Sequence, residues 1–194
     1  MSLEPAPDKR EFRLKLRALL KTLPDAERSA ASLRACALLR LQPVWKSARA
    51  VLFYAPLAGE IDLSPLINEG LREGKAIALP RFMAETGAYG AFQIRDAAGD
   101  CAPGKFGISE PTARCASFPP KRLDLALAPG VGFDAAGHRL GRGRGFYDRL
   151  LAQISGIKCG VAFDQQLVER IPVERHDARM NCILTPTRWL EISE

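Results

Sequence analysis

The sequence predicts an α/β protein of three layers, in which a mainly parallel sheet carries helices on both faces and follows an N-terminal helical pair. Two observations lead to this fold class. Along residues 49–190, short apolar runs with strand character alternate with helical segments, as in βαβ units. Ahead of them, residues 8–42 show helical periodicity. The length of 194 residues and the hydrophobic content of 47% fit one domain over residues 1–194, with the helical segment packed on the α/β body.

The two N-terminal helices are predicted to meet at Pro24. The first begins at Asp8, whose spacing to Glu11 resembles a capping box, and runs to about Leu23. Its apolar residues form one stripe at helical spacing: Phe12, Leu16, Leu19, Leu20 and Leu23. The second helix runs to about Leu41 and ends before a proline.

Five buried strands are predicted in the rest of the chain: Val51–Tyr54, Ala76–Leu79, Leu123–Ala128, Cys159–Phe163 and Ile183–Thr185. Helices are predicted from Ser64 to Gly74 and over Gly145–Ile154. A hairpin is predicted over Tyr89–Arg95, turning at residues 97–100. Ligands of such folds bind at the carboxyl ends of strands. These ends are marked here by Tyr54, Pro80 and Pro129.

Composition excludes several classes of protein. The five cysteines are odd in number, widely spaced and without a C-x-x-C pair, so neither a zinc site nor a disulfide framework is expected: Cys36, Cys101, Cys115, Cys159 and Cys182. The N-terminus carries acidic residues and lacks the apolar core of a signal peptide. No stretch approaches the roughly 20 apolar residues of a membrane span. We therefore expect a cytoplasmic protein.

The net charge of +6 is concentrated in the first quarter of the chain. Residues 1–49 hold 11 Lys and Arg against 5 Asp and Glu, whereas residues 50–194 hold 17 of each kind. A basic protein with a pI near 9.3 is a candidate for nucleic-acid binding. Such binders interleave aromatic with basic residues, and this quarter holds only Phe12 and Trp45. A site for a small polyanion is an equally good interpretation.

The strongest candidate for a ligand site is the loop R-L-G-R-G-R-G-F-Y-D-R at Arg139–Arg149. Its alternate glycines let the backbone approach a ligand, the following helix favours an anion, and its arginines match phosphate oxygens. The alternative is a flexible, solvated turn, which the glycine pattern alone does not exclude. Two rival motifs fail, because the chain has no G-x-x-x-x-G-K-[ST] and the glycines come too late after Pro129 for a Rossmann fingerprint.

Two aspartates are candidate Mg²⁺ ligands. Asp148 lies one turn beyond Gly145, where a carboxylate reaches an ion held by bound phosphates, although compensation of a helix dipole explains it equally well. Asp177 is the second candidate, and taken alone it is better explained as a turn residue. No catalytic role is assigned to His138 or His176, because no paired nucleophile motif accompanies them.

Two further patterns indicate ligand-binding residues only when they are combined with the other motifs. Lys9, Arg13 and Arg17 recur at i, i+4 and i+8 and border the apolar stripe of the first helix, although a solvated face is the default explanation. Glu60 follows the first predicted strand, where a carboxylate accepts hydrogen bonds from a ring amine or amide. Acidic loop residues are also commonly without function.

Taken together, the motifs resemble the 5-formyltetrahydrofolate cyclo-ligase family, also called 5,10-methenyltetrahydrofolate synthetases, from Lys9 to about Thr185. The motifs that carry the resemblance are K-R-E-F-R at Lys9–Arg13, Y-A-P-L-A-G-E-I-D at Tyr54–Asp62, L-P-R at Leu79–Arg81, F-G-I-S-E-P at Phe106–Pro111, P-G-V-G-F-D at Pro129–Asp134, the loop at Arg139–Arg149, G-V-A-F-D-Q-Q at Gly160–Gln166 and H-D at His176-Asp177.

The resemblance implies a set of site residues. ATP-binding positions are Lys9, Arg10, Glu11, Phe12, Arg13, Arg139, Leu140, Gly141, Arg142, Gly143, Arg144, Gly145, Phe146 and Tyr147. Positions that border the folate are Ala55, Glu60, Arg142, Gly143, Arg144, Gly145 and Phe146. Asp148 and Asp177 serve Mg²⁺. Phe146 departs from the Tyr of many members, and Asn181 stands at a position that is often acidic.

The implied activity is the conversion of ATP and 5-formyltetrahydrofolate to ADP, phosphate and 5,10-methenyltetrahydrofolate, with Arg144 and Arg139 closest to the transferred charge. The implied partners are ATP and a reduced folate, with Mg²⁺ as cofactor and neither nucleic acid nor membrane; a monomer is expected. Two alternatives remain open: a small-metabolite kinase that uses the same loop, and a basic nucleic-acid-binding module. The second gives no reason for Asp148 and Asp177.

Overall fold

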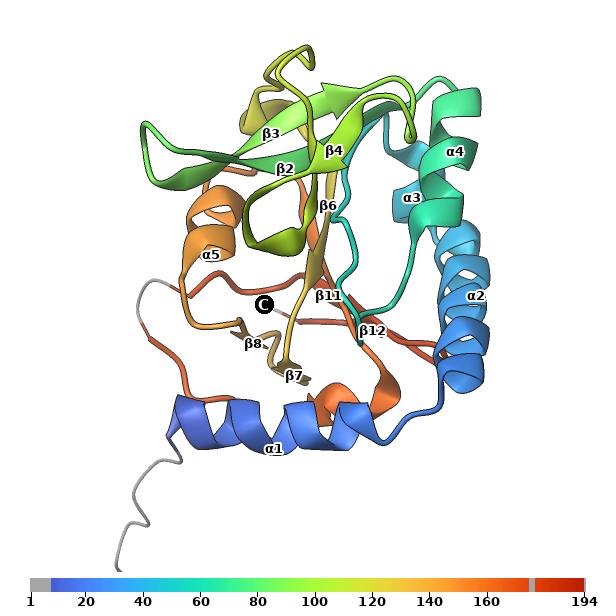
Figure 1. The fold of residues 1–194 in the computed structure, drawn as a ribbon. Helices are drawn as coiled ribbons and strands as arrows, with labels where there is room; N and C mark the ends of the chain where they lie inside the picture. The colour runs from blue at the N-terminus through green and yellow to red at the C-terminus, as the bar shows by residue number, and fades with distance from the viewer. Residues whose placement is uncertain (1–7, 175–176, 194) are drawn as a thin grey trace, which may run out of the picture.

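The architecture is built on one central sheet of seven strands (Figure 1). The computed structural model describes residues 8–174 and 177–193. The strand order is β12-β11-β9-β6-β1-β2-β3. The five inner strands are parallel, and the two edge strands, β12 and β3, are antiparallel to their neighbours. The strands are β1 Ala50–Leu52, β2 Ala76–Met83, β3 Ala88–Ile94, β6 Leu125–Pro129, β9 Ile157–Val161, β11 Cys182–Leu184 and β12 Trp189–Glu191.

Helices cover both faces of this sheet, which confirms the predicted three layers. Val51 and Phe53 pack in the core shared with the helices on one face, while Ala50 and Leu52 pack in the core shared with α5 on the other. This alternation follows from the two-residue period of a strand. The first face carries α2 (Asp25–Leu41), α3 (Pro43–Ser47) and α4 (Ser64–Arg72), and the second carries α5 (Phe146–Leu151) (Figure 1).

The first helix, α1 (Lys9–Lys21), packs on a second, smaller sheet instead of the central one. Asp8 caps it as predicted, but its side chain accepts a hydrogen bond from the backbone N of Arg10 at 3.0 Å, and Glu11 pairs with Lys15 instead of completing a capping box. The smaller sheet has the order β10-β7-β8, made of Leu167–Val168, Gly132–Asp134 and Arg139–Leu140. Leu16 of α1 and Leu140 of β8 belong to one apolar cluster. α1 therefore lies alongside β7 and β8, next to the start of the glycine-arginine loop (Figure 1).

One predicted pairing is wrong. The strand over Tyr89–Arg95 exists as β3, but it forms a hairpin with β2 through the turn at residues 84–87, and not with a strand after residues 97–100. The later turn leads into β4 (Cys101–Pro103), which pairs with β5 (Ser109–Pro111) in a separate two-stranded sheet. The error came from ending β2 at Pro80. Proline lacks only an N–H, and β1 pairs with β2 no further than Ala78, so Pro80 leaves no partner unsatisfied.

Short elements escaped prediction: β4, β5, β7, β8, β10, β12 and α3. Most have two or three residues, too few for a periodic pattern. In the part of the chain that the structure describes, no helix has the length and apolarity that a membrane crossing requires.

Candidate active site

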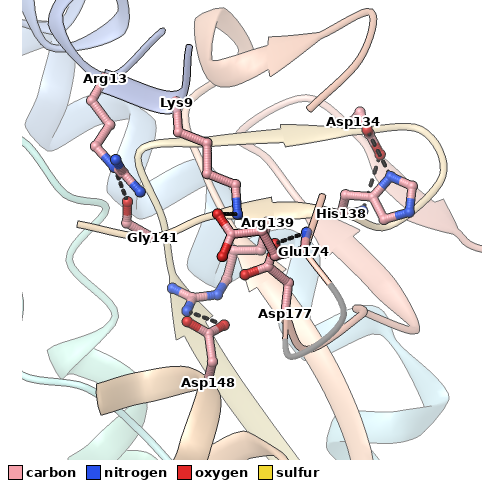
Figure 2. Close-up of polar contacts among 9 residues, drawn as sticks. All are labelled: Lys9, Arg13, Asp134, His138, Arg139, Gly141, Asp148, Glu174 and Asp177. Atoms are coloured by element: carbon pink, nitrogen blue, oxygen red, sulfur yellow. Dashed lines mark hydrogen bonds and ion pairs between the residues drawn. The ribbon is translucent and has the colours of Figure 1, made fainter. Parts of the chain in front are cut away.

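The glycine-arginine loop runs from β8 to α5 and contains two glycines with positive φ angles. Gly143 has φ of +107° and Gly145 has φ of +62°, conformations that side-chain-bearing residues rarely adopt. Arg144 is exposed between them. On the other side, Arg13 of α1 donates from Nε to the carbonyl oxygen of Gly141 at 2.8 Å (Figure 2). The loop is therefore held from α1, which lies more than a hundred residues earlier in the sequence.

A buried ion pair lies beneath the loop. Nη2 of Arg139 contacts Oδ1 of Asp148 at 2.7 Å (Figure 2). Its Nη1 donates to the carbonyl oxygen of Pro129 at 2.9 Å. Only 4% of Arg139 and 8% of Asp148 is exposed. The Nε of Arg139 is buried and has no hydrogen-bond partner among the described residues. Arg139 thus joins the end of β6, the start of the loop and the first turn of α5.

A second ion-pair group ties α1 to the segment before β11. Nζ of Lys9 lies 2.7 Å from Oδ2 of Asp177 and 3.0 Å from Oε1 of Glu174 (Figure 2). Partial burial acts to lower the pKa of Lys9, but the hydrogen bonds and charges of the two carboxylates outweigh it, so the pKa of Lys9 is raised. Lys9 is therefore a stable cation beside Asp177 throughout the neutral pH range.

The first cavity, of about 320 Å³, opens at the carboxyl ends of the central strands. Its walls are largely aromatic and aliphatic, with a charged rim. It is lined by Tyr54, Ala55, Leu57, Glu60, Pro80, Tyr89, Ile108, Pro129, Arg139, Gly141, Arg142, Arg144, Gly145, Phe146, Tyr147 and Asp148. Phe146 packs edge-on against Tyr89 and Phe82, at 5.9 and 5.4 Å between ring centroids. The three strand ends predicted to border a ligand, Tyr54, Pro80 and Pro129, all lie in this wall.

The polar groups in this cavity include the Glu60 carboxylate and the phenols of Tyr54 and Tyr147. Glu60 accepts hydrogen bonds at Oε1 from Arg142, at 2.7 Å from Nη2, and at Oε2 from the backbone N of Leu57, at 2.9 Å. Burial raises the pKa values of Tyr54 and Tyr147, so both phenols stay protonated at neutral pH. The Tyr147 hydroxyl is buried without a hydrogen-bond partner among the described residues. The cavity therefore offers a carboxylate and a phenol to a flat, polar ligand.

A second, open groove of about 740 Å³ lies on the other side of the glycine loop. It is lined by Gly143, Arg144, Gly145, Asp148, Arg149, Ala152, Lys158, Asp177, Ala178 and Arg179. Four cationic side chains and two carboxylates line it, together with glycines and alanines, and no aromatic residue is among them. Arg144, Gly145 and Asp148 line both the cavity and the groove. The loop is therefore the partition between an aromatic chamber and a charged one.

The residues present fit a magnesium ion that is carried by phosphates. Asp148 and Asp177 face the same groove, and Mg²⁺ commonly takes one or two carboxylates together with phosphate oxygens and water. Asp148 uses Oδ1 for Arg139, which leaves Oδ2 for another contact. Among the described residues no three His, Cys, Asp or Glu side chains gather as a self-sufficient metal cage. The donor set suits Mg²⁺ delivered with a nucleotide.

Only some of the expected ATP-binding residues of α1 lie near the glycine-arginine loop. Lys9 and Arg13 face the loop region, whereas Phe12 packs in the apolar cluster beneath α1. Arg10 and Glu11 are exposed, and Glu11 pairs with Lys15 at 3.3 Å on the outer face of the helix. Leu140 is likewise a buried core residue, whereas the rest of the loop, Ala55 and Glu60 line one cavity or the other.

The two residues that depart from the family pattern, Asn181 and Phe146, both make defined contacts in the structure. Asn181 accepts a hydrogen bond at Oδ1 from the backbone N of Lys158, 2.9 Å away, and so joins β9 to the start of β11. Phe146 supplies a ring to the aromatic wall without a hydroxyl.

Of the two histidines, His176 lies outside the described residues. His138 places Nδ1 at 2.9 Å from Oδ2 of the buried Asp134 (Figure 2). Asp134 also accepts from the backbone N of Ile171 at 2.8 Å. Burial opposes ionisation of Asp134, but these hydrogen bonds prevail and lower its pKa. The pair holds the β7–β8 turn, in agreement with the absence of a predicted catalytic role for His138.

Sequence reasoning missed several cavity residues. Tyr89 comes from an edge strand whose partner was misassigned, and Ile108 comes from the loop between β4 and β5. The F-G-I-S-E-P motif contains Ile108, but it did not indicate that this loop lies in the wall of the cavity. In the groove, Lys158 and Arg179 were missed because no local pattern links them, and Arg149, the last residue of the loop motif, was given no role.

This arrangement defines an α/β enzyme with a glycine-arginine loop between an aromatic cavity and a cationic groove. Residues 5–186 match the 5-formyltetrahydrofolate cyclo-ligase family, and the chain belongs to that family. It is 34% identical to the 5-formyltetrahydrofolate cyclo-ligase of Escherichia coli strain K12 over 148 residues, which cover 74% of this chain and 81% of that protein. The Mycolicibacterium smegmatis enzyme of the same name is 34% identical over 159 residues, covering 74% and 77%.

The fold agrees with this relationship. The NMR structure of Aquifex aeolicus 5,10-methenyltetrahydrofolate synthetase superposes with a TM-score of 0.86 at 34% identity, covering 96% of this chain and 93% of that one.

Proposed function

We propose that the protein converts 5-formyltetrahydrofolate to 5,10-methenyltetrahydrofolate with the hydrolysis of ATP to ADP and phosphate. One observation carries the proposal: Arg144, Gly145 and Asp148 line both the aromatic cavity and the cationic groove. A γ-phosphoryl group bound at this partition faces a folate in the cavity. Membership of the cyclo-ligase family supports the same reaction.

The folate belongs in the aromatic cavity. Its reduced pterin ring is flat and carries amide and amine donors, which match the Glu60 carboxylate and the aromatic walls formed by Tyr89 and Phe146. When the ring binds, Glu60 exchanges its hydrogen bonds from Arg142 for those of the pterin. Arg142, about half of whose side chain is exposed, is then available to the ligand's anionic groups.

The chemistry needs charge neutralisation more than a protein nucleophile. The formyl oxygen attacks the γ-phosphorus, ADP leaves, and an imidate phosphate forms. The neighbouring N10 amine attacks the formyl carbon, the carbon–oxygen bond to phosphate breaks, N10 gives up its proton, and the five-membered ring closes. Phosphoryl transfer of this kind depends on positioning and electrostatics. Arg144 contacts the transferred phosphoryl group, and Arg139 orients Asp148 through their buried ion pair.

The nucleotide belongs in the cationic groove, with its γ end at the partition. Asp148 and Asp177 would hold Mg²⁺ there, which supplies neutralisation of phosphate charge when bound. Lys9 keeps Asp177 oriented toward the groove through the 2.7 Å ion pair. The groove suits a triphosphate because four cationic side chains line it and no aromatic residue does: Arg144, Arg149, Lys158 and Arg179.

We further propose a cytoplasmic monomer that binds ATP and a reduced folate and does not bind nucleic acid. Several cations of the basic N-terminal quarter are used internally. Lys9 pairs with two carboxylates, Arg13 binds the loop, and Arg28 donates to the carbonyl oxygen of Leu20. The basic charge therefore serves the site more than a surface for nucleic acid.

The direct test is an absorbance assay for the methenyl product. The purified protein is incubated with 5-formyltetrahydrofolate, with and without ATP and Mg²⁺, and ADP is quantified in parallel. Product formation that requires ATP and matches ADP one to one is expected. Accumulation of ADP with a stable phosphorylated product would identify a kinase instead and overturn the proposal.

Replacing both Lys9 and Arg13 with Ala is expected to raise the KM for ATP at least about tenfold and to leave the KM for folate within about twofold. The reason is that Lys9 orients Asp177 and Arg13 holds the loop at Gly141, and a charged hydrogen bond is worth about 1.5–3 kcal/mol. The matched control is Arg10→Ala with Lys15→Ala, which removes the same charge from the exposed face of α1. Equal effects of the two double variants on ATP would assign Lys9 and Arg13 to the solvated face.

A further inference from the structure

The cationic groove continues well beyond the glycine loop. Gly145, Asp148, Arg149 and Ala152 line it at spacing i, i+3, i+4 and i+7, so they form one face along α5 and its C-terminal end. At the helical rise this face extends roughly 10 Å from the loop. The groove is also lined by the segment Asp177–Arg179 and by Lys158, the second residue of β9. A ligand held at the loop therefore has a charged channel leading away from the aromatic cavity.

Two of the three cations beyond the loop are engaged with the protein. Arg179 donates from Nε to the carbonyl oxygen of Ala136 and from Nη2 to that of Ser193, both at 2.8 Å. Arg149 donates to the carbonyl oxygen of Gly87 at 3.2 Å and stacks over the Phe146 ring at 5.0 Å. Both guanidinium groups are thereby fixed as parts of the wall.

Lys158 differs from these two arginines. Its backbone N is held by Oδ1 of Asn181 at 2.9 Å, and its place on β9 is set by pairing with Ala126 of β6. Its ammonium group, in contrast, takes part in no hydrogen bond or ion pair within residues 8–174 and 177–193. The backbone of Lys158 is thus fixed while its ammonium group faces the groove. This is expected of a side chain that binds a ligand and does not stabilise the fold.

We propose that Lys158 is a nucleotide-binding residue that contacts the α- and β-phosphates of ATP, with Arg149 as the second cation on the same groove. This inference rests on the proposed function, which places the γ-phosphate at Arg144. From that point the triphosphate extends away from the folate cavity, along the exposed face of α5, and toward Lys158. A lysine suits this position because its ammonium is a compact charge that accommodates several phosphate oxygens without a fixed planar geometry.

The test is Lys158→Met, which retains the aliphatic stem and removes the charge. The KM for ATP and the dissociation constant of ADP, measured by calorimetry without folate, are both expected to rise about tenfold. The turnover number and the KM for folate should stay within about twofold of the wild type, and Lys158→Arg should recover most of the affinity. Lys121→Met is the matched control, because Lys121 is exposed in the short helix Pro120–Arg122 and lines neither the cavity nor the groove.

Unchanged affinities for ATP and ADP in Lys158→Met would overturn the inference. A lowered melting temperature with equal rises in the KM for ATP and for folate would also overturn it, by making Lys158 a residue of the fold. Failure of the proposed function has a different signature, namely no methenyl product from the wild type. The ADP titrations still apply in that case, and weaker ADP binding to Lys158→Met would support the nucleotide site by itself.

Discussion

Arg144→Ala is expected to lower the turnover number by a factor on the order of 10²–10³, with small changes in the KM values for ATP and folate. Arg144 is exposed between Gly143 and Gly145 and lines both the aromatic cavity and the cationic groove. In the proposed reaction, the Arg144 charge meets the phosphoryl group as the group moves from the groove to the cavity. An interaction that is stronger in the transition state than in the ground state raises the turnover number and leaves substrate affinity nearly unchanged.

The conservative variant and a control sharpen this prediction. Arg144→Lys retains the charge but loses the planar fork, so it should recover part of the lost rate. Arg95→Ala, which removes an arginine that lines neither the cavity nor the groove, should have wild-type kinetics. Steady-state kinetics with both substrates varied measure all three variants. Full turnover of Arg144→Ala at saturating ATP would make Arg144 a binding residue and leave the catalytic charge to the metal.

Asp148→Asn is expected to lower the turnover number by on the order of 10²–10³ and, in addition, to destabilise the fold. The catalytic loss follows from the proposed role of Asp148 as a Mg²⁺ ligand at the partition. The loss of stability follows from its ion pair with Arg139, which is only 4% exposed. Removing one partner of a buried pair leaves an uncompensated charge and costs about 3–5 kcal/mol. Chemical denaturation and the product assay measure the two effects separately.

The double variant Arg139→Met with Asp148→Asn separates the two roles. Replacing the whole pair by groups without charge removes the buried, unpaired guanidinium, so the free energy of unfolding should recover in part while turnover stays low. Turnover that returns together with stability would show that Asp148 acts only through the fold. A second measurement is the affinity for ATP with and without Mg²⁺. The metal should strengthen ATP binding to the wild type and have little effect on Asp148→Asn.

Much of the candidate site was predictable because its residues are close together in the sequence. The loop from Arg139 to Tyr147 has its own glycine pattern, and its two left-handed glycines are a local backbone requirement. Tyr54, Pro80 and Pro129 were picked out from apolar runs as strand ends, and all three line the aromatic cavity although β2 continues past Pro80 to Met83. The roles of the loop residues in binding ATP and folate remain predictions, which the variants above are designed to test.

Other features were not predictable from local patterns. The burial of Arg139 was missed because an arginine beside glycines gives no sign of whether it faces solvent or core. The sheet order and the turn at 84–87 decided that Tyr89 lies in the cavity wall. Lys158 meets the groove only because β9 lies beside α5 and the segment before β11, and such neighbours arise from strand order, not from periodicity.

The sequence by itself determined the three-layer fold class, the cap of α1 at Asp8, the inner strands and the glycine turns of the loop before α5, because each depends on hydrogen bonding and burial within a few residues. Only the tertiary structure decided which distant charges meet. Lys9 contacts Asp177 across 168 positions, and Arg142 contacts Glu60 across 82. The physical reason is that such pairs form where packing brings separate segments together, here α1 with the segment before β11, and the loop after β8 with the loop after β1. The order of the strands is set by the packing of the whole chain, and spacing along the sequence does not encode it.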